Sequence, residues 1–525
     1  MSDSKGTYSL IFKAGLIVIV LSMVDKVMAL AKEMCIAHRF GISAGLDVFN
    51  VAYALPGIVV LMVSGAFAAA FVPLYIEWTK SSSPEEADAH ALGFLYGMLA
   101  LFAALAVLGY VFSPRLFRMI GYGFEDDARL LGSSVEGLLM LFLFLEGAAI
   151  VPAALLHSRK RFYGLYLAPL FVNASIIAAV AVFTDLGIYA LVWGTIAGTF
   201  LKAAFTLAAV SRSGFRLTGR TSFDRSHLRA FFLLMLPLFG GQLIANSNIL
   251  IDQVMATQLS TGSVSALRYA YRINDLPIQV VVLGLSKAIF PYISEFAANK
   301  DRESLIKVFR FSLVLLGFIT FPIIVVVAVH AQEIVTLLLQ RGAFDLNAAQ
   351  QTARTLVLYT SGLFFFAYTF INGVYFSALQ DTMPLLTMGG VAIVLNALLN
   401  YVFMHLLGVS GIALSSSVLH GVLSVVFIVM LKKRLGFGSF VSLFSGFPRL
   451  ILAGVCMAGF SLLLNIGIDA LGWNRVACLI PSVTLTCSFY LAMVYLLRTE
   501  EIDTCFSVLK QRGSALKDRL GIFAG

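Results

Sequence analysis

The feature that most constrains the fold of this chain is a succession of apolar segments separated by short polar connections. A helix of about 20 apolar residues spans the hydrocarbon core of a bilayer. Charged residues make up only 12% of the chain, whereas a soluble globular protein carries about 25%. The sequence therefore predicts an all-α polytopic membrane protein. We expect about fourteen transmembrane helices, near residues 8–37, 48–77, 91–113, 133–157, 161–183, 186–210, 229–257, 264–294, 305–329, 353–378, 384–405, 411–431, 447–468 and 476–497.

Lysine and arginine are distributed unequally between the two sets of connections. One set, together with both terminal segments, holds 24 of the 37 basic residues, the opposite set holds 7, and 6 lie inside predicted helices. Basic residues accumulate on the cytoplasmic side of membrane proteins. We therefore expect both termini in the cytoplasm, which an even number of helices also requires. The net charge of +9 is explained by this topology, with anionic membrane lipids rather than nucleic acid as the expected partner.

An internal repeat divides the chain. The pairs Leu55-Pro56 and Leu186-Gly187 recur as Leu276-Pro277 and Leu407-Gly408, both at an offset of 221 residues. Six helices per copy keep the same orientation, so the copies are related by a pseudo-two-fold axis along the membrane normal. We expect an N-terminal lobe (1–214), a basic cytoplasmic linker (215–228), a C-terminal lobe (229–435) facing the first across a central cavity, and two further helices with a cytoplasmic tail (436–525).

The repeated prolines fall inside corresponding helices. Pro56 and Pro277 each remove a backbone hydrogen bond and permit a kink, so both are candidate hinges of an alternating-access carrier. The alternative is that proline is simply common in membrane helices.

Two predicted helices carry charged residues in apolar surroundings. The first contains Asp25, Lys26, Lys32 and Glu33, and the eighth contains Arg268, Arg272, Asp275 and the deeper Lys287. Each ionisable group near the middle of a bilayer costs about 3 kcal/mol. A hydrated cavity with an anionic ligand would offset that cost, and a diphosphate matches the donors of arginine and lysine. The alternative is that these residues form ion pairs within or between helices.

A weaker polar cluster consists of Asp252, Asn396, Asn400 and Ser416. It combines one carboxylate with amide and hydroxyl oxygens, and such oxygens suit a cation such as sodium. Interhelical hydrogen bonding is the alternative interpretation.

Five cysteines without paired spacing predict neither a metal site nor a disulfide framework. No signal peptide is expected, and no arrangement of nucleophile, base or paired carboxylates predicts an enzyme.

Several motifs resemble those of the MurJ/MviN lipid II flippases, within the multidrug/oligosaccharidyl-lipid/polysaccharide exporter superfamily. In the first lobe they are A-K-E-x-x-x-A-x-x-F-G (31–41), D-x-F-x-V-A-x-x-L-P (47–56) and G-A-F-x-x-A-F-V-P (65–73). In the second lobe they are G-S-V-S-A-L-x-Y-A-x-R (262–272), F-P-x-I-S (290–294), Q-D-T (380–382) and G-x-x-G-I-A-L (408–414). The resemblance covers about residues 10–435 in order.

The resemblance implies a flippase that moves undecaprenyl-diphosphate-linked peptidoglycan precursor, lipid II, from the inner to the outer leaflet of the bacterial cytoplasmic (inner) membrane. By position, Lys26 and Lys32 match two arginines of the family, Arg272 matches a third, and Glu33 and Asp47 match acidic residues. The sodium site of some members would fall on the four residues named above, and the last two helices would form a groove for the lipid tail. We expect no cofactor beyond sodium or proton coupling, peptidoglycan synthases as partners, and a monomer.

The chain departs from the family pattern in its basic residues. Both helix 1 arginines are lysines, which keep the charge but lose the forked geometry. The family's helix 2 arginine is absent, because residues 56–65 read PGIVVLMVSG, and Arg268 is an additional base. A flippase for another polyprenyl-diphosphate-linked oligosaccharide, such as O-antigen or exopolysaccharide, is therefore an alternative. A cation-coupled multidrug exporter and a non-transporting scaffold that recruits synthases are others.

Overall fold

Helices fill the part of the chain that the computed structural model describes, residues 2–222, 225–381, 383–436 and 444–497. No strand occurs within those ranges. Cys505, Thr382 of the Q-D-T motif and the predicted cytoplasmic tail lie outside them. The prediction of an all-α chain is confirmed.

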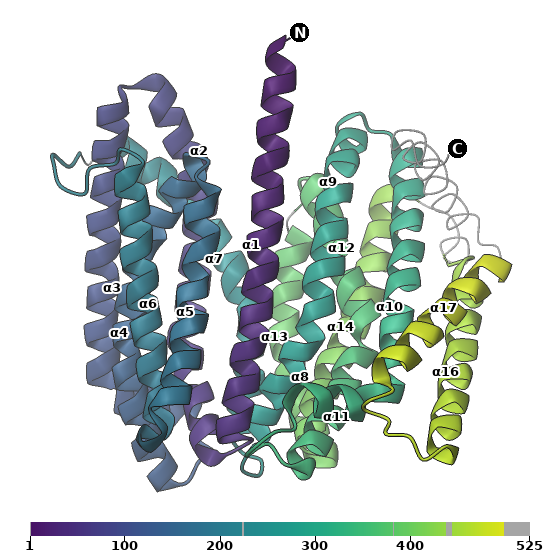
Figure 1. The fold of residues 1–525 in the computed structure, drawn as a ribbon. Coiled ribbons are helices and arrows are strands. Elements are labelled where there is room, and N and C mark those ends of the chain that lie inside the picture. Colours follow the sequence, from purple (N-terminus) through teal and green to yellow (C-terminus); the bar gives the residue numbers. More distant parts are fainter. Residues whose placement is uncertain (1, 223–224, 382, 437–443, 498–525) are drawn as a thin grey trace, which may run out of the picture. The chain divides into compact units, whose positions relative to one another are not determined.

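The chain divides into two compact units, and the first extends to Ser265 and includes residues 339–348. Ser43 caps α2, where its side chain accepts a hydrogen bond from the Leu46 amide. Ser83 and Glu86 form a capping box at α3. The helices of this unit (Figure 1) are α1 (Ser2–Phe40), α2 (Ala44–Ser81), α3 (Pro84–Ile120), α4 (Asp126–Ser158), α5 (Phe162–Val182), the short η1 (Thr184–Leu186), α6 (Ile188–Arg212) and α7 (Arg225–Ala256).

The second unit comprises residues 266–338 and the chain from Ala349 onwards. Its helices are α8 (Ser263–Pro277), whose first three residues belong to the first unit, the π-helix η2 (Ile278–Val282), α9 (Leu283–Ala298), α10 (Arg302–Leu339), α11 (Leu346–Ser361), α12 (Leu363–Ala378), α13 (Met383–Leu407), α14 (Val409–Leu435), α16 (Phe447–Ala470) and α17 (Leu479–Leu497).

Eleven helices of the described residues are long and apolar enough to cross a membrane, and α11 with α12, bent by 44°, makes a twelfth span. The two other predicted spans correspond to α1 and to the continuous run α8–η2–α9, which carry the charged residues. Each of the fourteen predicted segments therefore coincides with a helix or a helical run.

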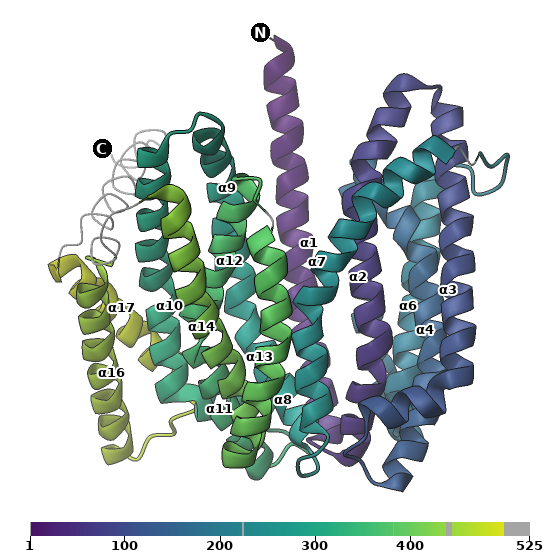
Figure 2. The same cartoon turned by 180° about the vertical axis from the view of Figure 1, so that it is seen from behind.

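The first unit is built around α4, most of whose membrane-spanning window is buried. Aromatic rings join its neighbours: Phe94 of α3 and Phe67 of α2 both pack against Phe231 of α7, with ring centroids 4.7 and 5.3 Å apart. Helix α7 therefore runs along α2 in the first unit (Figure 2). The lobe boundary predicted from the sequence repeat placed this helix in the second lobe. That assignment stays a prediction.

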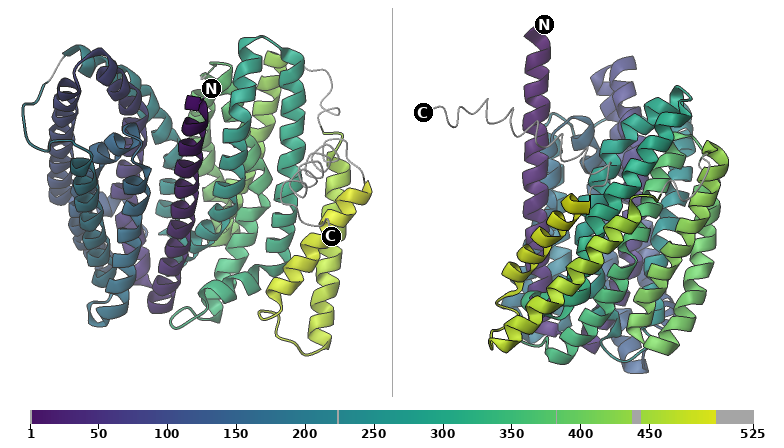
Figure 3. Two further views of the ribbon diagram at one scale, coloured as in Figure 1. Left: turned by 45° about the horizontal axis from the view of Figure 1, so that its top comes forward. Right: turned by 90° about the vertical axis from the view of Figure 1, so that its right-hand side faces the viewer.

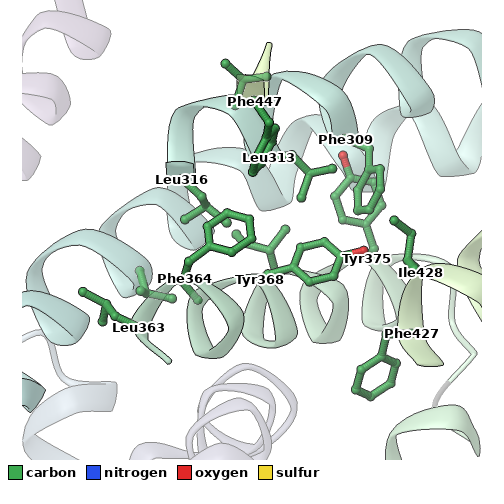
Figure 4. Close-up of a cluster of buried hydrophobic side chains, with 14 of the residues drawn as sticks. Phe309, Leu313, Leu316, Leu363, Phe364, Tyr368, Tyr375, Phe427, Ile428 and Phe447 are labelled. Carbon is green, nitrogen blue, oxygen red and sulfur yellow. The ribbon is translucent and has the colours of Figure 1, made fainter. Parts of the chain in front are cut away.

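The second unit has its own aromatic core (Figure 4). Phe309 of α10 packs against Tyr375 of α12, and Phe364 of α12 packs against Phe447 of α16. Helices α16 and α17 form a hairpin (Figure 3). The hydroxyl of Tyr490 on α17 donates a hydrogen bond to the Phe318 carbonyl of α10 at 3.1 Å, which joins the hairpin to the core.

The backbone supports the repeat read from the sequence. Gly187 has φ 53° and ψ −131°, and Gly408, 221 residues later, has φ 61° and ψ −139°. This region of conformational space is essentially restricted to glycine. Gly41 and Gly262, at the same offset, also have positive φ, 57° and 89°. Two copies of one chain path explain why unusual backbone conformations recur at a fixed spacing.

Candidate substrate-binding site

The charged residues of α1 differ in their surroundings. Lys26 is exposed and forms no ion pair among the described residues. Asp25 is half-buried and accepts a hydrogen bond from Nδ2 of Asn173 on α5 at 3.0 Å. Lys32 Nζ lies 3.3 Å from Oε1 of its neighbour Glu33. Of the ion pairs considered from the sequence for α1, the structure thus contains the one between Lys32 and Glu33, whereas Asp25 is bound by an amide.

The bases of α8 belong to the second unit. Arg272 is exposed and Arg268 is half-buried. Asp275 accepts a hydrogen bond at 2.5 Å from Nε2 of Gln279, one turn further along. The buried Asn274 accepts one at 2.9 Å from the Thr360 hydroxyl of α11, which fixes the rotation of α8 within this unit.

The predicted site residues are therefore divided between the units. Lys26 and Lys32 belong to the first, and Arg268 and Arg272 belong to the second. Each unit supplies two bases from a helix that otherwise reads as a membrane span, so each offers an anionic headgroup a pair of cationic donors.

Asp47, a predicted substrate-binding residue, is buried at the start of α2 with 2% of its surface exposed. Its carboxylate accepts hydrogen bonds from the Gly262 amide (2.6 Å), the Ser265 amide (2.7 Å) and the Ser265 hydroxyl (2.5 Å). These groups form the first turn of α8, where unpaired amides favour an anion. Asn50 adds a hydrogen bond to the Ser265 hydroxyl at 3.3 Å. Asp47 thus caps α8, and a role in binding substrate stays a prediction.

Gly262 makes this cap sterically feasible. Its φ is +89°, and a Cβ there would lie 2.5 Å from the Ile42 carbonyl oxygen. Because a side chain would push the loop away from α2, only glycine brings the α8 amides to Asp47. The boundary between the two units follows directly after Ser265.

The two predicted hinges differ in their local structure. Pro277 ends α8 and is followed at once by the π-helix η2, whereas Pro56 lies within the unbroken helix α2. Single π-helical turns often occur at functional sites. Neither proline is tested as a hinge, so both stay predictions.

The candidate sodium ligands are also divided between the units. Asp252 is buried on α7 of the first unit, and Asn396 and Asn400 are buried on α13 of the second. Ser415, the neighbour of the predicted Ser416, donates a hydrogen bond to Asn400 Oδ1. The described residues contain no group of three or more histidines, cysteines, aspartates or glutamates, the usual ligands of tighter metal sites.

Two polar groups inside the first unit were missed by the sequence reasoning. Lys202 Nζ on α6 lies 2.8 and 2.7 Å from the two carboxylate oxygens of Glu146 on α4. Glu136, also on α4, is fully buried. A search for lone charged residues in apolar helices could have found all three. Their pairing could not be read from the sequence, because Glu146 and Lys202 are 56 residues apart.

Arg159, in the turn between α4 and α5, joins several elements of the first unit. It contacts Asp88 at 2.5 Å, the Tyr75 hydroxyl at 2.8 Å and the Ser213 carbonyl at 2.9 Å. Burial lowers the pKa of Arg159, but its hydrogen bonds to Asp88 and Tyr75 raise that pKa above the ordinary value. Arg159 therefore stays charged and holds the chain after α6 to the ends of α2 and α3. From the sequence it contributed only to the count of basic connections.

The chain is similar to known proteins over most of its length. Residues 36–475 match the family model described as "Lipid II flippase MurJ". The chain is 28% identical to a probable lipid II flippase MurJ of Rhizobium meliloti (strain 1021), covering 81% of this chain and 82% of the relative. It is 24% identical to the lipid II flippase MurJ of Burkholderia cenocepacia, covering 93% of this chain and 97% of the relative.

Solved structures show the same fold. A structure titled "Lipid II flippase MurJ, inward closed conformation" matches with a TM-score of 0.78 at 20% identity, over 92% of this chain and 98% of that one. An inward-facing multidrug resistance MATE family transporter of the MOP superfamily matches with a TM-score of 0.70 at 15% identity, over 80% of this chain and 98% of that one. The resemblance to the lipid II flippases seen in the motifs is confirmed by the family model.

Proposed function

Since this chain belongs to the MurJ family of lipid II flippases, we propose that it moves lipid II from the inner to the outer leaflet of the bacterial inner membrane. The match over residues 36–475 carries this proposal, because it includes all of α8 and the α2 segment that binds it. The relatives of this chain are named as flippases, which are transporters, and this agrees with the prediction that the chain is not an enzyme.

The basic residues of α1 and α8 are the proposed headgroup ligands. A diphosphate carries two negative charges or more, and Arg272 and Arg268 present forked donors while Lys26 and Lys32 present compact charges. An anionic headgroup offsets the cost of keeping such bases within the membrane. The exposure of Lys26 and Arg272 supports them as the first residues to be met by substrate.

Alternating access would require the outer end to close and open. The cap of Asp47 on α8 supports a role in closure, because three donors converge on one buried carboxylate where the chain passes from one unit to the other. Loss of this cap would free the first turn of α8. Both termini would lie in the cytoplasm, as the distribution of basic residues predicts.

The driving force and the partners are part of the same proposal. Sodium bound by Asp252, Asn396, Asn400 and Ser416, a proton, or the membrane potential would supply the energy, and each charge moved through 100 mV yields about 2.3 kcal/mol. Peptidoglycan synthases would receive the product, and the flippase would act as a monomer.

Complementation tests this proposal. In a strain depleted of its own lipid II flippase, the wild-type chain should restore growth, and Arg272→Ala or Lys26→Ala should fail. Lys80→Ala is the matched control, because it removes an exposed base in the last turn of α2 to which no role is assigned. All variants must be present in the membrane at equal levels. Rescue by every variant would contradict the roles of the bases, and failure of a well-expressed wild type would favour another lipid-linked oligosaccharide as substrate.

A further inference from the structure

Helices α3 and α4 pack against each other in a single antiparallel register. Small residues on either helix lie against large ones on the other, with equal spacing along both helices. The contacts pair Phe117 with Gly132, Gly109 with Met140, and Phe102 with Gly147. Counting from these contacts, the position of α3 that faces Glu136 of α4 is Ser113, and the neighbouring contact between Gly137 and Ser113 agrees.

Glu136 is enclosed in this seam between α3 and α4. Its exposed fraction is 0%, and neither of its carboxylate oxygens has a hydrogen-bond partner among the described residues. An ionised carboxylate without a partner is so costly in an apolar interior that the group takes up a proton instead. The burial of Glu136 therefore favours the neutral carboxylic acid.

The α3 surface opposite Glu136 offers hydrogen-bond acceptors. Pro114 has no amide hydrogen, so it leaves the Tyr110 carbonyl without its helical donor. The Ser113 hydroxyl donates to that carbonyl at 2.9 Å. The hydroxyl hydrogen of Ser113 is used in this bond. The Ser113 hydroxyl oxygen and the Tyr110 carbonyl oxygen therefore have only lone pairs left for a further hydrogen bond. Lone pairs stabilise a carboxylic acid, which can donate, and repel a carboxylate.

Charged groups on the helices around α4 are engaged elsewhere or exposed, and α5 carries none. Among them, Arg115 and Arg118 of α3 are exposed, Asp47 of α2 binds Gly262 and Ser265, Lys202 of α6 binds Glu146, and Arg129 of α4 itself binds Asp126.

The surface beside the seam between α3 and α4 is also apolar. A groove of about 390 Å³ runs along it and is bordered by Tyr110 and Gly137, the neighbours of the buried pair. Tyr110 is its one polar lining side chain, and the rest of the lining is apolar, including Val107 and Leu141. With the seam closed, Glu136 forms no ion pair among the described residues that would stabilise its carboxylate, and the groove beside it is lined almost entirely by apolar side chains.

We propose that Glu136 is a proton-binding site in the first unit. The side chain is a carboxylic acid while α3 and α4 are packed as in this structure. When the seam opens, its O–H bond breaks and the proton passes to water, leaving a hydrated carboxylate. This site goes beyond the proposed lipid transport, since it assigns a bound proton to a helix that carries none of the proposed headgroup ligands.

Infrared difference spectroscopy of the purified full chain tests the site directly. Wild type minus Glu136→Gln should show the carbonyl stretch of a protonated carboxylic acid at neutral and mildly alkaline pH. Wild type minus Glu77→Gln, which removes an exposed carboxylate of α2, should show none. Ser113→Ala, which removes one acceptor, should shift the band to higher frequency. Absence of the Glu136 band would overturn the proposal, as would a band unaffected by Ser113→Ala.

Transport into vesicles at several pH values tests the link to seam opening. The rate of the wild type should change with pH, and Glu136→Gln should remove that dependence. Identical pH profiles for both proteins would contradict the link. If the wild type moves no lipid II, the proposed function fails while the infrared result still decides the protonation of Glu136.

Discussion

Asp47 shows how a single buried charge can be stabilised at the edge of a membrane helix. Its carboxylate meets two backbone amides and one hydroxyl of the first turn of α8. These amides lack partners within α8, because the first turn of any helix leaves them unpaired. The charge and the helix terminus therefore satisfy each other, and removal of either leaves buried polar groups unpaired.

Asp47→Asn should destabilise the protein by about 1–3 kcal/mol, because the amide replaces a charged acceptor and leaves at least one buried donor unsatisfied. Thermal unfolding in detergent, followed by intrinsic fluorescence, measures the change. Asp126→Asn is the control, since Asp126 is almost fully exposed at the start of α4. Equal unfolding temperatures for the two variants would show that the cap does not stabilise the fold.

The buried Glu146 and the half-buried Lys202 form a second charge arrangement at this scale. The pair is net neutral and both oxygens of Glu146 contact the amine, so α4 and α6 are joined by a charge that neither helix could bury alone. The presence of such an ion pair says little about the total stability of a protein. Removing one partner, however, leaves the other charge isolated.

A double-mutant cycle separates these effects. Glu146→Leu and Lys202→Met alone should each destabilise by about 3–5 kcal/mol, and the double variant should lie close to wild type, because an apolar pair has no charge to satisfy. Unfolding temperatures and membrane expression levels provide the measurement. Additive losses in the double variant would show that the two side chains act independently.

At the scale of elements, the helices were predictable because a bilayer span requires a long apolar run, and that run is visible in the sequence. What escaped prediction lies where helices meet. The division of the eighth predicted helix into α8, η2 and α9 was not predicted beyond the hinge proposed at Pro277. The position of Ser113 opposite Glu136 depends on the register of α3 against α4, which the sequence does not contain.

Gly187 and Gly408 test the repeat at this scale. Alanine at either position should destabilise by about 1–3 kcal/mol, because both have a conformation restricted to glycine although no atom lies within 4 Å of the added Cβ. Equal losses are expected, since the two turns are copies of one another. Gly467→Ala, in an open position of α16, should instead be neutral or stabilising by up to about 1 kcal/mol. Unequal losses at Gly187 and Gly408, measured by thermal unfolding, would argue against equivalent turns.

At the scale of the whole molecule, the predicted topology rests on the distribution of basic residues and can be tested by cysteine labelling in intact cells. In a chain with Cys478 replaced by serine, Asp185→Cys should react with a membrane-impermeant reagent, and Lys300→Cys should react only after the cells are opened. The two exposed sites lie between α5 and α6 and between α9 and α10, on predicted opposite sides. The reverse pattern would invert the orientation.

The candidate site was predictable only in part. Charged residues in apolar helices drew attention to Lys26, Lys32, Arg268 and Arg272, because each is costly in a membrane. The sequence could not show that Asp47 is committed to the amides of α8, since that contact joins residues more than 200 positions apart. The identity of the substrate came from similarity to a family rather than from the chemistry of any one residue.

The most direct test of lipid II transport is the amount of lipid II in the outer leaflet of cells depleted of their own flippase. It is measured with an enzyme added outside that cleaves the exposed diphosphate. Induction of the wild-type chain should restore cleavage within one generation, and Arg272→Ala, expressed at the same level, should not. Lipid II that stays protected from the enzyme while the wild-type chain is abundant in the membrane would contradict the account.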